Sequence, residues 1–187
     1  MKPALTATLS LMLLALVVPQ GGTAQGILPR PEAVVSLCAQ PAKLALAPGS
    51  TATVKLTVDI MPGFHINSNQ PLQEYLIPTE VFLPAPTGPA VPKLRDEFEL
   101  TGVSYPKAEL KSFGFAPGEK LAVYEGRVEI AVRLRARPAA QPGQRKLALG
   151  LRYQACNDQI CLRPAKRQLT LSIEIRPKTS PGQRPGS

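Results

Sequence analysis

Apolar and polar residues alternate along several segments of the chain with the period of a β-strand. In the segment 54–60 every even-numbered residue is Val, Leu or Ile, and polar residues lie between them. The same alternation recurs in segments 128–135, 147–154 and 169–176. Each segment therefore predicts a strand with one buried face and one solvated face, and we find no run with a helical period.

Turn sequences separate these segments. Pro-Gly pairs stand at 48–49, 117–118 and 142–143, where proline presets one backbone dihedral angle and glycine permits the next. Three weaker strand candidates complete the set: 34–39, 77–83 and 98–103. Seven or more short strands with one apolar face predict an all-β fold, an immunoglobulin-like antiparallel β-sandwich. An open barrel is the main structural alternative.

The N-terminal segment has the features of a secretory signal peptide. Lys2 precedes an apolar run over residues 4–18, and small residues follow. This run is shorter than the roughly 20 residues that a spanning helix needs. We expect a signal peptide at 1–24, one domain at 25–176 and a disordered, Pro-rich basic tail at 177–187. The mature protein is then periplasmic or secreted and has no integral membrane segment.

The chain is basic, with 22 Lys and Arg residues, 13 Asp and Glu residues and a formal net charge of +9 at pH 7. A basic exported protein can attract acidic partners. However, Arg133, Arg135 and Arg137 recur at strand spacing, which is typical of a solvated face. The sequence has neither a helical recognition element nor an aromatic stacking pattern, so we expect no nucleic-acid binding.

Cys156 and Cys161 flank a loop of four residues between two predicted strands. Residues that flank such a hairpin loop face each other with Cα atoms about 4.5 to 5.5 Å apart, where disulfides form. The pair can therefore be oxidised and reduced with little backbone movement. A structural disulfide is the alternative, although closing a loop of roughly six residues gains only about 2 kcal/mol. In an oxidising compartment the spacing alone leaves both roles open.

Few other residues offer ligands or thiols. His65 is the single histidine, and there is no second close cysteine pair, so we expect no metal site and no cofactor. Cys38 lies in an apolar strand segment, and we interpret it as a small buried side chain. A reactive thiol or an intermolecular partner is the alternative for Cys38.

A family resemblance rests on two segments. Residues 153–164 have the sequence YQACNDQICLRP: a Tyr-Gln strand end, a Cys, a short polar loop with Asp, a second Cys and a proline. This pattern resembles the active-site hairpin of the DsbD N-terminal domain family. Residues 62–69, PGFHINSN, with Ile-Pro-Thr at 77–79, are similar to that family's upstream strand. With the alternation from about 34 to 175, the resemblance covers nearly all of the mature chain.

The resemblance implies a thiol–disulfide interchange domain. Members of this family receive electrons from thioredoxin-like partners and pass them to oxidised exported proteins through mixed disulfides. By resemblance, Cys161 forms the mixed disulfide and Cys156 resolves it; thiol chemistry by itself assigns neither role. The full reductase continues into a membrane electron conduit and a thioredoxin-like domain. We therefore expect the electron source of this chain to be a separate thioredoxin-fold protein, with a membrane conduit as a further candidate.

The resemblance also implies residues around the dithiol. Tyr153 and His65 would line the site, and we interpret His65, between apolar neighbours, as a strand residue rather than a base for a cysteine. Members cover the dithiol with an aromatic-bearing cap loop, which matches residues 111–115 here. Phe113 or Phe115 would shield the sulfurs, or would be a core aromatic.

The loop between the cysteines is one residue shorter than in some members of the family. Its acidic residue, Asp158, would raise the thiol pKa and keep the reduced form less reactive until a partner docks. Alternatively, Asp158 would stabilise the turn by bonding its own backbone. For the whole chain, the alternative function is a non-enzymatic Ig-like protein-binding module that keeps the hairpin disulfide as a local clamp.

Overall fold

The structure, a computed structural model, describes residues 28–84 and 96–177. The signal peptide at 1–24 lies outside these residues, as does all but the first residue of the tail at 177–187, and both stay predictions. In the part of the chain that is described, no helix has the length and apolar character needed to cross a membrane.

Strands make up most of the regular structure. The elements in chain order are η1 (Pro31–Ala33), β1 (Val35–Gln40), β2 (Lys43–Leu46), β3 (Thr51–Ile60), β4 (His65–Asn67), β5 (Glu80–Phe82), β6 (Phe98–Ser104), β7 (Glu109–Lys111), β8 (Leu121–Glu125), β9 (Arg127–Ala136), β10 (Gly143–Tyr153), β11 (Ala155–Cys156) and β12 (Ala165–Ile175). The four strongly alternating segments correspond to β3, β9, β10 and β12, with the predictions for β10 and β12 ending one residue too late, and the weaker candidates correspond to β1, β5 and β6.

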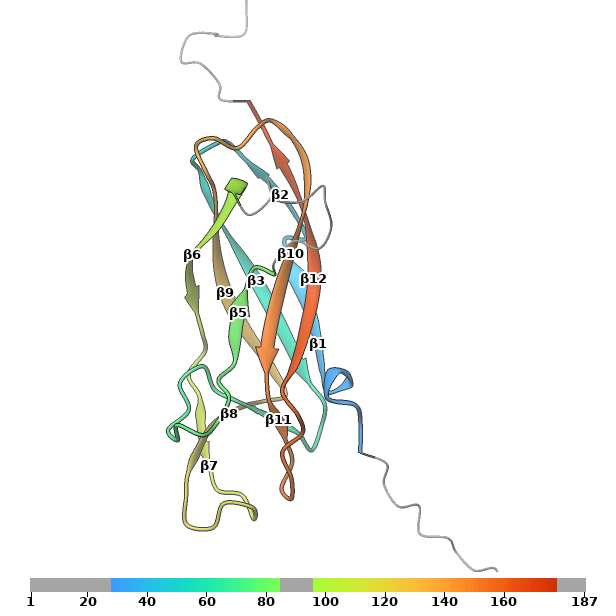
Figure 1. The fold of residues 1–187 in the computed structure, drawn as a ribbon, viewed down its shortest axis with the longest axis vertical. Coiled ribbons are helices and arrows are strands. Elements are labelled where there is room, and N and C mark those ends of the chain that lie inside the picture. Colours follow the sequence, from blue (N-terminus) through green and yellow to red (C-terminus); the bar gives the residue numbers. More distant parts are fainter. Residues whose placement is uncertain (1–27, 85–95, 178–187) are drawn as a thin grey trace, which may run out of the picture.

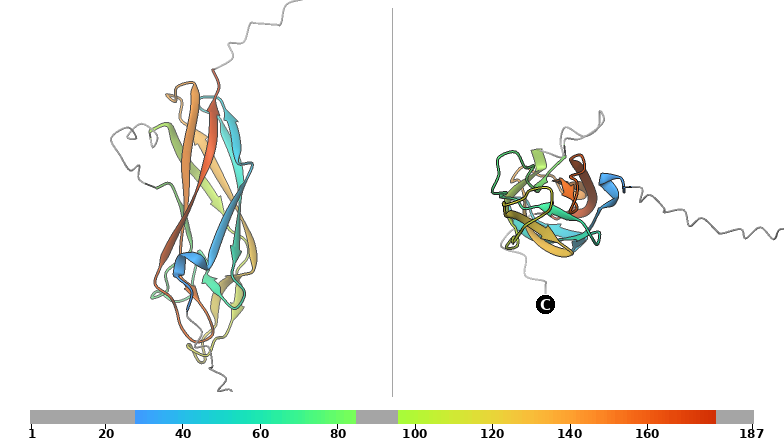
Figure 2. Two further views of the ribbon diagram at one scale, coloured as in Figure 1. Left: turned by 90° about the vertical axis from the view of Figure 1, so that its right-hand side faces the viewer. Right: turned by 90° about the horizontal axis from the view of Figure 1, so that it is seen from below.

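Two four-stranded sheets form an elongated sandwich (Figures 1 and 2), in the orders β1-β3-β9-β6 and β2-β12-β10-β5. Their inward side chains share one core, in which Leu56, Leu134, Leu149 and Ile173 are fully buried. This arrangement confirms the predicted immunoglobulin-like fold. The pairing of β2 with β12 is parallel, which the sequence did not predict because alternation carries no information on strand direction.

A third, smaller sheet of order β11-β4-β8-β7 lies at one end of the sandwich (Figure 1). Two of its strands continue long strands of the large sheets. Only Gly126 separates β8 from β9, and only Gln154 separates β10 from β11. Gly126 has a φ of 60°, a conformation that glycine adopts at little cost. The chain therefore passes from each large sheet into the small one, which carries one cysteine of the hairpin.

The two faces of the small sheet pack against different clusters. Ile66 and Tyr124 lie directly opposite each other on β4 and β8, and both are buried in the main core. Leu121 and Val123 belong to a second, smaller cluster around Phe113. Because successive strand residues point to opposite faces, the small sheet separates the main core from this second cluster.

Cys38 is exposed, so its interpretation as a buried side chain is wrong. Val35 and Ala39 on the same strand are buried, whereas Cys38 lies opposite Thr57 in the pairing of β1 with β3. The apolar neighbours predicted burial. The period of two along the strand instead places Cys38 on the outer face.

Candidate functional site

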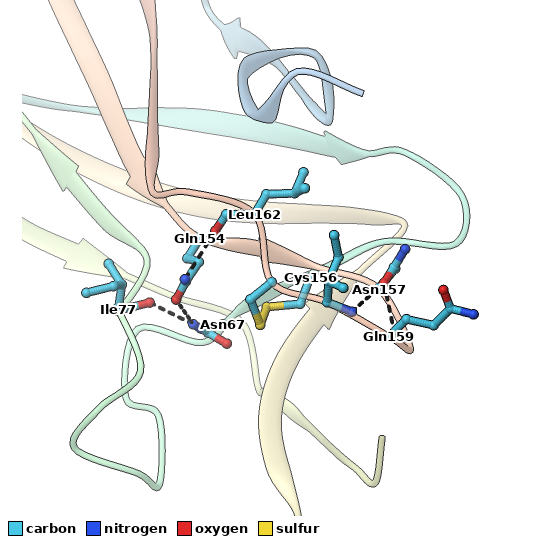
Figure 3. Close-up of a disulfide and its surroundings, with 9 residues drawn as sticks. Asn67, Ile77, Gln154, Cys156, Asn157, Gln159 and Leu162 are labelled. Carbon is cyan, nitrogen blue, oxygen red and sulfur yellow. Dashed lines mark hydrogen bonds between the residues drawn. A yellow bond between two sulfur atoms is a disulfide. The ribbon is translucent and has the colours of Figure 1, made fainter. Parts of the chain in front are cut away.

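A disulfide joins Cys156 and Cys161 at the tip of the hairpin between β11 and β12 (Figure 3). The two residues form an isolated antiparallel bridge, and their Cα atoms are 4.0 Å apart, slightly closer than predicted. Below them, the N–H of Leu162 donates to the carbonyl oxygen of Ala155 at 2.8 Å. The cysteines therefore face each other across a hairpin, as the loop length predicted.

Asn157 fixes the loop between the cysteines (Figure 3). Its Oδ1 accepts hydrogen bonds from the N–H groups of Gln159 and Ile160, both at 2.9 Å. Its own N–H donates to the carbonyl oxygen of Ile160, also at 2.9 Å. The turn-stabilising role considered for Asp158 thus falls to its neighbour Asn157, and Asp158 is exposed at the tip.

Gln154 and Asn67 brace the base of the hairpin (Figure 3). Asn67 Nδ2 donates to the carbonyl oxygen of Ile77 at 3.0 Å and to Gln154 Oε1 at 3.4 Å. Gln154 Nε2 donates to the carbonyl oxygen of Leu162 at 3.2 Å. Neither residue was predicted to have a role at the site. Their place inside the two quoted segments was the signal that could have identified them.

The two sulfur-bearing residues differ in access to solvent. Cys156 is fully buried, whereas Cys161 is exposed. Cys161 also lines an open pocket of about 420 Å³, together with Tyr75, Phe115 and Gln154. Thiol–disulfide exchange requires a thiolate to reach one sulfur of the bond, so access favours attack at Cys161.

Aromatic rings stack beside the buried cysteine. His65 lies directly opposite Cys156 in the pairing of β4 with β11, and directly opposite residues share one face of a sheet. The imidazole stacks on Phe113 with ring centroids 3.9 Å apart and an interplanar angle of 22°. Phe115 follows, with its centroid 5.7 Å from that of Phe113. The structure therefore brings His65, Phe113 and Phe115 together at Cys156.

The loop that carries both phenylalanines also contacts the cysteine hairpin. A Cβ atom on Gly114 would lie 3.3 Å from the carbonyl oxygen of Asp158, so the two loops pass within van der Waals distance. At the start of this loop, Lys111 forms ion pairs with Glu125 on β8 and, at 3.3 Å, with Glu109. The ion pairs of Lys111 therefore fix the start of the loop, and the stacking of Phe113 on His65 fixes its middle.

Tyr153 lies away from the aromatic stack. Its ring is fully buried in the main core, and its hydroxyl donates to the carbonyl oxygen of Pro31 at 2.8 Å. Burial raises the pKa of Tyr153 to about 12. The structure thus places Tyr153 next to the hairpin in sequence, with its side chain directed into the sandwich.

His65 is neutral at ordinary pH. Burial lowers its pKa to about 4, against smaller opposing effects of the Glu125 and Asp158 carboxylates. The residue is 2% exposed, and its Nε2 is buried without a hydrogen-bond partner. An imidazole in this environment keeps one N–H and carries no charge near pH 7.

We expect the oxidised protein to lose stability as the pH falls from about 6.5 to about 4. The unfolded chain protonates His65 near pH 6.5 and the folded chain only near pH 4, so the unfolded state binds more protons between these values. The loss is on the order of 2 kcal/mol. Thermal unfolding followed by circular dichroism from pH 4 to 7.5 measures it. A His65→Phe variant should show a flatter profile; an unchanged profile would contradict this assignment.

Comparisons with known proteins give one family match. The family model described as "Thiol:disulfide interchange protein DsbD, N-terminal" matches residues 35–173. No curated protein sequence matches the chain significantly.

Several solved structures show weak similarity. The seventh ScaB type I cohesin from Pseudobacteroides cellulosolvens has 11% identity and a TM-score of 0.40, over 78% of this chain and 94% of the cohesin. A PapD-like domain of human CEP192 has 10% identity and a TM-score of 0.39, over 92% of this chain and all of that domain. A family 123 glycoside hydrolase from Clostridium perfringens has 12% identity and a TM-score of 0.38, over 79% of this chain.

This chain spans only 28% of the glycoside hydrolase, and TM-scores of this size carry no argument about function. The family model, in contrast, covers both large sheets almost completely, the small sheet and the cysteine hairpin. The matched residues make up more than half of the sequence. The chain therefore belongs to the family of DsbD N-terminal domains.

Proposed function

We propose that this chain is a periplasmic thiol–disulfide interchange domain. It passes reducing equivalents between a thioredoxin-like partner and oxidised exported proteins through Cys156 and Cys161. One observation carries the proposal: the disulfide has one exposed cysteine beside an open pocket and one buried cysteine. Family membership supports the class of reaction, and the difference in access supports the order of attack.

In the reducing half of the cycle, a thiolate of the partner attacks the sulfur of Cys161. The bond between Cys156 and Cys161 breaks, Cys156 leaves as a thiolate, and a mixed disulfide joins Cys161 to the partner. A second partner thiolate then attacks the partner's own sulfur and releases Cys161. Two electrons have moved to this domain, the partner is oxidised to a disulfide, and both cysteines are reduced.

In the oxidising half, the Cys161 thiolate attacks a disulfide of an exported protein and releases one thiolate of that protein. Cys156 then attacks the sulfur of Cys161 and releases the second thiolate. The disulfide between Cys156 and Cys161 forms again, and the exported protein holds two thiols. Cys156 therefore acts only on Cys161, which agrees with its burial.

We assign the loop at 111–115 as a cap over the dithiol. Phe113 is buried in the second cluster and stacks on His65, and Phe115 lines the pocket at Cys161. These positions support shielding of the buried sulfur from small oxidants and reductants. Exposed apolar side chains border the same pocket, among them Tyr75 at 65% exposure, and they offer a partner an apolar contact surface.

We expect the Cys156–Cys161 pair to have a reduction potential above about −300 mV, because structural disulfides of secreted proteins lie below that value. Equilibration with glutathione buffers, followed by alkylation of free thiols and mass measurement, gives the potential. A Cys38→Ser background removes the exposed third thiol from the titration. A potential below the stated value would favour the structural clamp over the carrier.

A further inference from the structure

The proposed reaction leaves a negative charge on a buried sulfur. When a partner attacks Cys161, the sulfur of Cys156 leaves as a thiolate, and Cys156 is fully buried. Burial without a compensating partner raises the pKa of a thiol and disfavours its thiolate. An exchange-competent site therefore needs a hydrogen-bond donor or a cation that faces Cys156.

The charged groups on this side of the small sheet do not meet that need. Glu125 on β8 lies directly opposite His65, and Asp158 stands on the hairpin, so each carboxylate would repel a thiolate. Lys111 on β7 is the nearby cation. Its ammonium group already pairs with Glu125 and with Glu109.

His65 carries an unpartnered group of the required kind. Within the described ranges, the buried side-chain atoms without a hydrogen-bond partner are His65 Nε2, Asn67 Oδ1, Gln73 Oε1 and Arg152 Nε. The two amide oxygens accept but do not donate. Arg152 lies on β10, and its guanidinium group forms an ion pair with Glu80 on β5. His65 Nε2 is the remaining donor-capable atom, and its residue is the direct cross-strand neighbour of Cys156.

We propose that His65 donates a hydrogen bond from Nε2–H to the thiolate of Cys156 whenever the disulfide is open, and so stabilises that thiolate. Directly opposite residues have Cβ atoms about 4.5 to 5.5 Å apart, within reach of an imidazole and a thiolate. The stacked ring of Phe113 holds the imidazole in place. This inference rests on the proposed function, in which Cys156 is the leaving and the resolving sulfur.

A neutral imidazole suits this role. Burial lowers the pKa of His65 to about 4, so the ring has an N–H to donate but does not take up the proton of the thiol. In the reducing half, the hydrogen bond makes Cys156 a better leaving group. In the oxidising half, it increases the fraction of Cys156 present as the attacking thiolate. No proton moves through His65 in either step, and solvent exchanges the thiol proton.

The test uses 5,5′-dithiobis(2-nitrobenzoate) as the probe and the reduced protein with Cys38→Ser. Attack by Cys161 releases one thionitrobenzoate, and attack by Cys156 on the resulting mixed disulfide releases a second. We expect His65→Phe to leave the first step unchanged and to slow the second about threefold. A rise of one unit in the pKa of Cys156 removes most of its thiolate. The higher nucleophilicity of the remaining thiolate offsets part of that loss, so the net decrease in rate is only about threefold.

The second readout is the thiol pKa of Cys156 itself, from ultraviolet thiolate absorbance of the protein with Cys38→Ser and Cys161→Ser. We expect this pKa to rise by about one unit with His65→Phe, which keeps the ring stack. It should stay near the parent value with His65→Gln, which keeps a donor. His65→Met has the length of Gln without a donor and replaces the Phe variant if that variant does not fold.

Equal Cys156 pKa values in the parent and in the donor-free variants would overturn the inference. An equal rise with His65→Gln and His65→Met would also overturn it, because the donor would then be irrelevant. Failure of the proposed function looks different. In that case a Cys156→Ser variant forms no disulfide-linked adduct with a thioredoxin-fold partner, whichever residue occupies position 65.

Discussion

A Cys156→Ser variant is expected to accumulate a stable disulfide-linked adduct between Cys161 and a thioredoxin-fold partner, whereas a Cys161→Ser variant is expected to form none. Because Cys161 is exposed and Cys156 is buried, only the sulfur of Cys161 is open to a partner. Without Cys156, no thiol in this domain attacks the mixed disulfide, so the adduct persists. Adduct yield should therefore change from near-stoichiometric to undetectable between the two variants.

The measurement is non-reducing electrophoresis with mass spectrometry, using a thioredoxin-fold partner whose own resolving cysteine is replaced and whose remaining cysteine is first converted to its thionitrobenzoate disulfide. Attack by the Cys161 thiolate then forms the adduct and releases thionitrobenzoate. Both variants carry Cys38→Ser, because Cys38 is exposed on β1 and could form adducts unrelated to the site. An adduct through Cys156 would reverse the assigned roles. Partner binding that survives replacement of both hairpin cysteines, with no adduct in either single variant, would favour the binding-module alternative.

Period-two alternation was enough to predict the long strands and the sandwich. Strands β3, β9, β10 and β12 each have one face in the core, so their apolar residues recur at every second position. The small sheet was not predicted. Its strands are short, and both of its faces are covered near the site: β4 is buried at all three positions, which removes the alternation.

The candidate site was predictable where one loop determines it. Cys156 and Cys161 face each other because a four-residue hairpin loop sets their register. The stack of His65 on Phe113 joins β4 to a loop far along the chain, and no local pattern encodes such a contact. Similarly, Asn157 and Asp158 have the same turn propensity, and only the backbone geometry decides which side chain caps the loop.

A Phe113→Ala variant is expected to let small thiols reduce the Cys156–Cys161 disulfide at least about tenfold faster. Phe113 is the buried anchor of the cap loop, packed against Leu121 and Val123 and stacked on His65. The same loop places Phe115 in the pocket beside Cys161, so opening of the loop also widens the approach to that sulfur. Removing a buried Phe side chain costs about 3 kcal/mol, and each 1.4 kcal/mol changes an equilibrium tenfold. If only half of that cost falls on closure of the loop, the open population still rises about tenfold.

The measurement is the rate of disulfide reduction by excess dithiothreitol under native conditions, beside the free energy of unfolding from urea titration. Leu110→Ala is the matched surface control, because Leu110 lies on β7 at 58% exposure and its removal leaves the aromatic stack intact. We expect that control to change neither quantity appreciably.

Faster reduction could also arise from loss of overall stability, and a core variant separates the two causes. Leu134 is fully buried on β9 in the main core, so Leu134→Ala should destabilise the protein by about 2 to 5 kcal/mol without touching the cap loop. If the disulfide is protected locally by Phe113, reduction accelerates in Phe113→Ala and stays near the parent rate in Leu134→Ala, because global unfolding remains too rare to contribute. Equal acceleration in both variants would assign the protection to global stability and remove the shielding role of the cap.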